Sequence, residues 1–198
     1  MNKLTKIMTV YIFGILFSMM LVTIYHNTLL NNDIIPNETI IGISIIKTTD
    51  LPREKIFTIM TDIKNYTKIL PNNVLNVNII NQTKSDFISP IDVIFVEEKI
   101  SERGVMIEVI AKHDIEKFTY HKIEVMNGDA KGTVIEQRFE DIKNGTKIST
   151  EIKIHIKGIL APFGFLATSN LESAVNSVLD AFIEYPIQLN KDKEISKK

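Results

Sequence analysis

Cysteine and tryptophan are absent from this 198-residue sequence, and glycine and proline are scarce, with eight and six residues. Without cysteine the chain cannot be a disulfide-stabilised scaffold. The 23 basic and 24 acidic residues give a net charge of −1, so the basic excess typical of nucleic-acid-binding proteins is missing and we expect no nucleic-acid partner. Apolar residues are plentiful. They make up 44% of the chain, and the mean hydropathy is +0.08 although 24% of the residues are charged.

Part of this apolarity is concentrated near the N-terminus. Residues 7–25 carry no charged side chain, and Lys3 and Lys6 precede them. A helix of this length spans about 30 Å, the thickness of the hydrocarbon core, whereas the apolar part of a signal peptide is only about 7 to 15 residues long. No small-residue cleavage site follows, so residues 1–26 predict an uncleaved signal anchor, with a cleaved signal peptide as the alternative. Since positive charge stays on the cytoplasmic side, we expect a single-pass protein of the cytoplasmic membrane with its domain outside.

The rest of the chain divides into a linker, one domain and a tail. Residues 27–39 are polar and contain Pro36, which indicates a short linker. Residues 40–188 are long enough for one domain with its own core. Residues 189–198 form a charged tail, and the oligomeric state stays open.

The domain predicts one strand, two short helices, six strands and one long helix, in that order. The β-branched segment 40–47 is typical of a strand. Asp50 and Pro52 mark the start of a helix, and a second short helix ends before Pro71. The six later strands are expected at about 74–82, 86–97, 103–112, 117–126, 131–142 and 146–157, with Asn-Gly turns at 127–128 and 144–145 that favour antiparallel hairpins.

Two amphipathic elements indicate how the domain buries its core. In the last strand, isoleucines alternate with polar residues, so one face of the sheet is apolar. The long helix carries one apolar stripe, made of Leu171, Ala174, Val175, Val178, Leu179, Phe182 and Ile183. Laying this helix across the concave face of the sheet buries both surfaces. The sequence therefore predicts an α+β helix-grip fold, a curved antiparallel sheet of about seven strands around a C-terminal helix, preceded by a transmembrane helix.

Three short segments resemble the START-like superfamily, also called SRPBCC or Bet v 1-like, which includes polyketide cyclases and coenzyme Q-binding proteins. They are Asp50–Phe57 (DLPREKIF), Thr61–Tyr66 (TDIKNY) with the following Leu70-Pro71, and Pro162–Phe165 (PFGF) before the last helix. The resemblance covers about residues 40–185. It implies the helix-grip fold and a cavity between sheet and helix that holds a hydrophobic or amphipathic molecule.

Strand and helix periodicity then selects the residues expected to line this cavity. The polar residues Tyr120, Gln137 and Thr150 are expected to orient a ligand carbonyl or hydroxyl. The loop Pro162-Phe163-Gly164, beside the start of the last helix, is a candidate gate. The predicted ligand-binding residues are Phe95, Ile107, Tyr120, Gln137, Phe139, Thr150, Ile152, Phe163, Val175, Leu179 and Phe182.

The sequence shows little sign of catalytic chemistry. It has no phosphate-binding glycine loop and no nucleophile elbow. The histidines form no metal-binding spacing, and Glu136, Arg138 and Glu140 fit a solvated charge ladder. We therefore predict no catalytic residue, metal or cofactor, and a membrane-anchored module that binds or transfers a lipid or isoprenoid quinone. Two alternatives remain: a cyclase or dehydratase with Tyr120 and Gln137 as polar guides, and a structural or interaction domain with a filled core.

Overall fold

The computed structural model describes residues 39–85, 90–102, 105–128, 130–156 and 168–195. Within them, strands and helices follow the predicted order. The elements are β1 (Thr39–Thr49), α2 (Arg53–Thr61), the 3-10 turn η1 (Ile63–Asn65), α3 (Tyr66–Ile69), β2 (Val74–Thr83), β3 (Ile91–Glu102), β4 (Val105–Glu116), β5 (Tyr120–Gly128), β6 (Val134–Ile142), β7 (Gly145–Ile156) and α4 (Thr168–Ile195).

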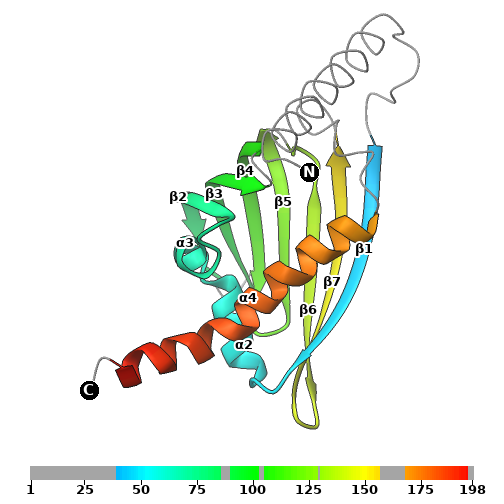
Figure 1. Cartoon of the computed structure of the whole chain (residues 1–198). Coiled ribbons are helices and arrows are strands. Elements are labelled where there is room, and N and C mark those ends of the chain that lie inside the picture. The colour runs from blue at the N-terminus through cyan, green and yellow to red at the C-terminus, as the bar shows by residue number, and fades with distance from the viewer. Residues whose placement is uncertain (1–38, 86–89, 103–104, 129, 157–167, 196–198) are drawn as a thin grey trace, which may run out of the picture. The chain divides into compact units, whose positions relative to one another are not determined.

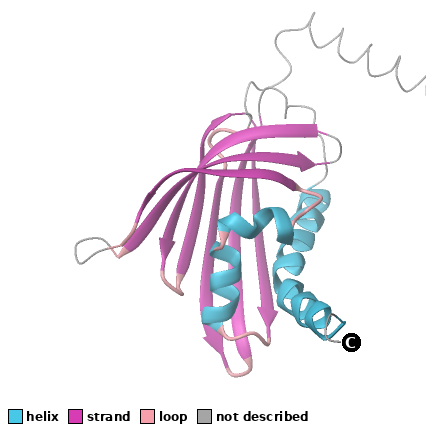
Figure 2. Cartoon of the chain, turned by 90° about the vertical axis from the view of Figure 1, so that its left-hand side faces the viewer, coloured by secondary structure: helices cyan, strands magenta, loops and turns pink. Residues whose placement is uncertain are grey.

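The strands form one antiparallel sheet with the order β1-β7-β6-β5-β4-β3-β2. Strands β2 to β7 lie next to their chain neighbours, and β1 closes the other edge by pairing with β7 (Figure 1). The sheet is strongly curved, and the helices lie on one side of it (Figure 2). The α+β helix-grip architecture predicted from the sequence is confirmed.

Some boundaries differ from those predicted. Strand β3 begins at Ile91, directly after Pro90, which has no N–H for a sheet ladder, and the predicted start at residue 86 lies outside the described residues. Helix α2 begins at Arg53, because Pro52 occupies the N-cap position in an extended conformation (φ −56°, ψ 145°). Helix α4 continues to Ile195, past residue 189, where the charged tail was expected to begin.

The β6–β7 turn depends on a glycine. Gly145 has φ +127°, and a Cβ at this position would lie 1.9 Å from the backbone oxygen of Thr49. A side chain is therefore excluded both by the backbone angle and by the neighbouring strand end. This explains why the Asn144-Gly145 pair marks the hairpin in the sequence.

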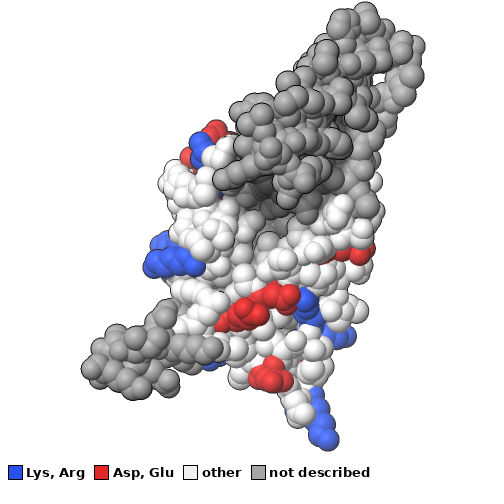
Figure 3. Space-filling view, viewed as in Figure 1, with Lys and Arg blue, Asp and Glu red and all other residues white. Residues whose placement is uncertain are grey.

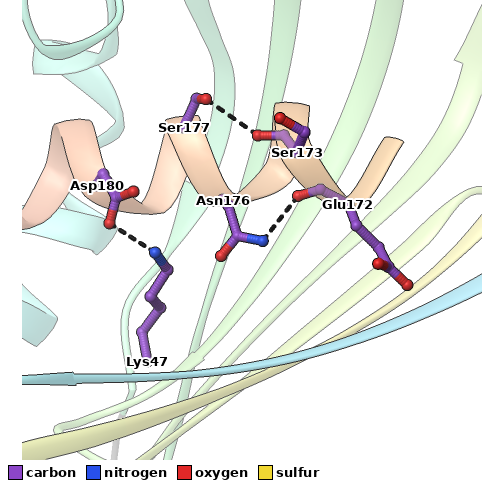
Figure 4. A network of polar contacts seen from close by, with 6 residues as sticks. All are labelled: Lys47, Glu172, Ser173, Asn176, Ser177 and Asp180. Atoms are coloured by element: carbon purple, nitrogen blue, oxygen red, sulfur yellow. Dashed lines mark hydrogen bonds and ion pairs between the residues drawn. The ribbon is translucent and has the colours of Figure 1, made fainter. Parts of the chain in front are cut away.

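Helix α4 packs across the sheet face through its apolar stripe, of which Leu179 and Phe182 are buried. Its position is also fixed by an ion pair, in which Lys47 Nζ of β1 lies 2.8 Å from Asp180 Oδ1 of α4 (Figure 4). The short helices contribute aromatic contacts. Phe57 meets Phe139 edge to face at 5.1 Å between ring centroids.

Within the described part of the chain, no helix is both long and apolar enough to cross a membrane. The predicted anchor over residues 1–26 and the linker up to residue 38 lie outside the described residues.

Candidate functional site

A cavity of about 340 Å³ lies between the sheet and α4. Its floor comes from β3, β5, β6 and β7, its roof from α4, and one end from α3 and the segment that follows it. This volume lies within the range of ligand pockets, which begins at about 300 Å³. A filled core, the structural alternative from the sequence, predicts no cavity of this size.

Six of the predicted ligand-binding residues line this cavity. Three of them come from β6 and β7, where apolar and polar residues alternate and mark one apolar face: Gln137, Thr150 and Ile152. Val175, Leu179 and Phe182 belong to the α4 stripe.

Two more predicted residues share this sheet face but do not line the cavity. Phe139 is buried against Phe57 in the core. Ile107 pairs with Ile100, which does reach the cavity. Phe163 lies outside the described residues.

Phe95 and Tyr120 were predicted to point inward, and this was wrong. In β3 the buried residues are Ile94 and Val96, so Phe95 between them faces the other side. The four residues before Glu97 are all apolar, so the sequence pattern does not show which of them face the core. Tyr120 pairs with Arg138, whose guanidinium carbon lies 5.1 Å from the centre of the Tyr120 ring on the outer face.

A row of buried polar side chains crosses the inner face beside the cavity, with one residue from each of four neighbouring strands. His121 Nδ1 lies 3.1 Å from Gln137 Oε1. His121 Nε2 lies 2.9 Å from His113 Nδ1. His113 Nε2 faces Glu98 Oε1 at 3.8 Å, beyond hydrogen-bond distance. Both imidazoles are fully buried, and Glu98 is 8% exposed. We refer to Glu98, His113, His121 and Gln137 as the polar row.

Sequence reasoning missed three of these four residues. The predicted ligand-binding residues included Gln137 but not Glu98, His113 or His121. A signal was present in β4, because the alternation that places Val109 inward reaches Ala111 and His113 when it is continued. Glu98 likewise follows Ile94 and Val96 on the inner side of β3.

Burial shifts the titration of the polar row toward neutral side chains. It raises the pKa of Glu98 from 4.5 to about 7. It lowers the pKa of His121 from 6.5 to about 4, against the opposing effects of the Gln137 hydrogen bond and the Asp114 charge. The pKa of His113 falls well below 6.5 through burial and the neighbouring His121. We therefore describe Glu98 and His113 as a neutral pair near pH 6, not as an ion pair.

Several polar atoms at the site have no hydrogen-bond partner in the structure. They are Glu98 Oε1, His113 Nε2 and Thr150 Oγ1, of which the Glu98 and Thr150 side chains line the cavity. Buried polar atoms are normally paired, and each exception suggests a partner or a functional role. The cavity thus combines apolar walls with a few polar atoms that can bind the polar end of a ligand.

The surroundings of the site give little sign of metal or polyanion binding. Among the residues the structure describes, no group of three or more His, Asp or Glu side chains is placed to hold a metal ion. On the face that carries α4, the visible charged side chains are few and of both signs (Figure 3). Neither observation identifies a cofactor.

No protein-family model and no curated protein matches this sequence. Solved structures do match the fold. The 18 kDa protein CC1736 from Caulobacter crescentus is 14% identical with a TM-score of 0.62, covering 76% of this chain and 99% of its own. A START superfamily protein from Mycobacterium smegmatis is 12% identical with a TM-score of 0.57, covering 75% and 98%. The Zhui aromatase/cyclase from Streptomyces sp. R1128 is 13% identical with a TM-score of 0.55, covering 74% and 93%. The chain therefore has the START-like helix-grip fold, as its sequence segments suggested.

Proposed function

We propose that this protein binds a hydrophobic small molecule with one polar end, a lipid or isoprenoid quinone, in the cavity between the sheet and α4. The observation that carries the proposal is the cavity itself, about 340 Å³ in volume with largely apolar lining. Apolar side chains supply the binding free energy, at roughly 25 cal/mol for each Å² removed from water. Thr150, Gln137 and Glu98 supply the few polar contacts that orient a ligand.

The proposal includes attachment of the domain to the outer side of the cytoplasmic membrane by residues 1–26. Lys3, Lys6 and the uncharged run 7–25 support it. A tether of this kind keeps the cavity near the bilayer, where an apolar ligand is dissolved, and so raises its effective concentration. A protein acting on a water-soluble metabolite gains nothing from the same tether. The test is to attach a protease-sensitive reporter to the C-terminus and ask whether external protease removes it from intact cells.

Cavity binding is tested by filling the cavity. Ala174 lines it from α4, and Ala174→Phe places a ring in the space a ligand would occupy. Glu172→Phe, on an exposed position of the same helix, is the matched control. The full chain is titrated with a fluorescent lipid, and we expect saturable uptake by the wild type and the control and at least tenfold weaker uptake by Ala174→Phe. No uptake by the wild type, or equal uptake by all three proteins, refutes the proposal.

One observation favours a second candidate, an enzyme that acts on a polyketide-like substrate. Glu98 is a buried carboxyl that lines the cavity, and burial raises its pKa to about 7, the range in which a carboxyl can both take and return a proton. Aromatase/cyclases such as Zhui share the fold. In this reading Glu98 removes a proton from the carbon between two carbonyls, and the resulting enolate reacts further.

The enzyme candidate is tested by hydrogen exchange. A long-chain 1,3-diketone is incubated in deuterated water with the full chain, and deuterium at the central carbon is followed by mass spectrometry. An exchange rate above the buffer rate that Glu98→Gln abolishes, and that Glu97→Gln on the opposite face leaves intact, supports an enzyme. A rate equal to that of buffer argues for binding alone.

A further inference from the structure

Glu98 is the polar group best placed to interact with a ligand. It lies between Val77 of β2 and Val109 of β4 in the sheet, and both strands present apolar side chains beside it. Its side chain is 9% exposed, lines the cavity, and has one oxygen without a hydrogen-bond partner. A ligand group that forms a hydrogen bond with this carboxyl therefore contributes favourably to the free energy of binding.

The titratable groups that face Glu98 are few among the described residues. Tyr66 of α3 lines the same cavity, and burial raises the pKa of its phenol, with smaller contributions from the charges of Glu98 and Asp62. His113 faces Glu98 from β4, with His121 of β5 behind it. The residues that α4 contributes to the cavity are all apolar: Leu171, Ala174, Val175, Val178, Leu179 and Phe182. Among the described residues, therefore, no charged side chain lines the cavity opposite Glu98.

With Glu98 protonated, the hydrogen bonds of the polar row run in one direction. Gln137 turns its carbonyl oxygen toward His121, so His121 Nδ1 carries the hydrogen and donates it. The neutral His121 ring then accepts at Nε2 from His113 Nδ1. His113 Nε2 is left as a bare acceptor that faces the carboxyl. In this state Glu98 O–H and the amide N–H₂ of Gln137 are hydrogen-bond donors available to the cavity.

With Glu98 ionised, the opposite direction is favoured, because a negative charge 3.8 Å from His113 Nε2 acts on that atom by electrostatic attraction and not through a hydrogen bond. A carboxylate favours a hydrogen on His113 Nε2, so His113 Nδ1 becomes the acceptor and His121 Nε2 the donor. His121 Nδ1 then needs a donor, which Gln137 supplies when its amide turns over. Glu98 and Gln137 now present a carboxylate and a carbonyl oxygen to the cavity, and both are acceptors. Loss of one proton from Glu98 therefore reverses the hydrogen-bonding character of both residues.

We propose that the polar row selects the oxidation level of the ligand's polar end: it accepts a carbonyl or a hydroxyl when Glu98 is protonated and only a hydroxyl when Glu98 is ionised. This inference rests on the proposed function, since it requires a ligand in the cavity. It deepens that function, because a ketone and its alcohol, or a quinone and its quinol, differ in whether their polar end can donate a hydrogen bond. Because burial places the pKa of Glu98 at about 7, the preference changes within the physiological pH range.

The test compares a matched ligand pair, 2-undecanone and 2-undecanol, which share one carbon skeleton. Each displaces a fluorescent lipid from the full chain at pH 5.5 and at pH 8.5. One hydrogen bond gained or lost corresponds to about a tenfold change in affinity. We expect the ratio of the ketone Kd to the alcohol Kd to rise about tenfold between the two pH values in the wild type and in Glu97→Gln, and to change less than twofold in Glu98→Gln.

The outcomes separate this inference from the proposed function. If both ligands displace the lipid with a ratio that does not depend on pH, or if Glu98→Gln keeps the wild-type change, the selection mechanism is wrong and the binding function stands. If the fluorescent lipid does not bind at either pH, the proposed function is wrong and the inference fails with it.

A second measurement uses the wild-type chain and does not depend on the folding of a variant. Nitrogen-15 NMR distinguishes a protonated from a bare imidazole nitrogen. We expect the hydrogen in His113 and His121 to pass from Nδ1 to Nε2 between pH 5.5 and 8.5, with one shared midpoint. Rings that keep one tautomer throughout contradict the reversal of the polar row.

Discussion

Replacing Glu98 by glutamine changes how the stability of the protein depends on pH. Folding raises the pKa of this carboxyl from 4.5 to about 7, so the folded state binds its proton more tightly than the unfolded state. Stability from this group is therefore complete below pH 4.5 and is lost as the pH rises through 7. The shift of roughly 2.5 units corresponds to about 3 kcal/mol when the pH exceeds both values.

Much of this loss of unfolding free energy falls within the pH range of an unfolding experiment, and it is large enough to measure. Between pH 5.5 and pH 8 the two pKa values give a loss of about 2 kcal/mol in the free energy of unfolding. Glutamine does not titrate, so Glu98→Gln removes this loss while other groups contribute equally to both proteins. The difference in unfolding free energy between variant and wild type should rise by about 2 kcal/mol over this range.

Urea unfolding followed by circular dichroism measures this difference at a series of pH values. Glu97→Gln is the control, because Glu97 is exposed on the opposite face and its profile should run parallel to that of the wild type. Parallel profiles for the wild type and Glu98→Gln refute the assignment of a buried, proton-binding carboxyl at this position.

Three further predictions concern the same core. Folding lowers the pKa of His121 from 6.5 to about 4, so the stability that this group contributes is lost as the pH falls from 6.5 through 4. His121→Gln should reduce that loss by up to about 3 kcal/mol, as measured by urea titrations at a series of pH values. Gly145→Ala places a Cβ against the Thr49 carbonyl and should lower the melting temperature strongly, whereas Gly42→Ala, with open space around it, should change it little; equal effects contradict the turn assignment. Phe139→Ala removes a ring that is 3% exposed and should cost about 3 to 5 kcal/mol of unfolding free energy, and a loss below about 1 kcal/mol means that the core is packed differently.

The sequence was informative wherever periodicity had one clear apolar side. The isoleucines of β7 and the stripe of α4 indicated the direction of Ile152, Leu179 and Phe182 correctly, because polar residues occupy the opposite positions. Together with the Asn144-Gly145 turn, they were sufficient to predict the architecture and the part of the cavity wall that β7 and α4 supply.

The polar row could not be found in the same way. Periodicity assigns polar residues to the solvent, so it did not indicate that His113, His121 and Glu98 face the core. Their burial depends on one another, since each ring nitrogen or carboxyl oxygen meets a group on the next strand. The proximity of these residues depends on the register of four neighbouring strands, and the sequence of a single strand does not determine that register.

The ligand-binding claim is tested most directly by the molecule that the protein itself carries. The full chain is purified from the cells that express it, extracted with organic solvent, and analysed by mass spectrometry beside Ala174→Phe. We predict that the wild type carries an apolar molecule with one hydroxyl or carbonyl end, in an amount approaching one per chain, and that Ala174→Phe carries much less. Equal amounts of bulk membrane lipid in both extracts, with no species enriched in the wild type, would contradict a ligand held between the sheet and α4.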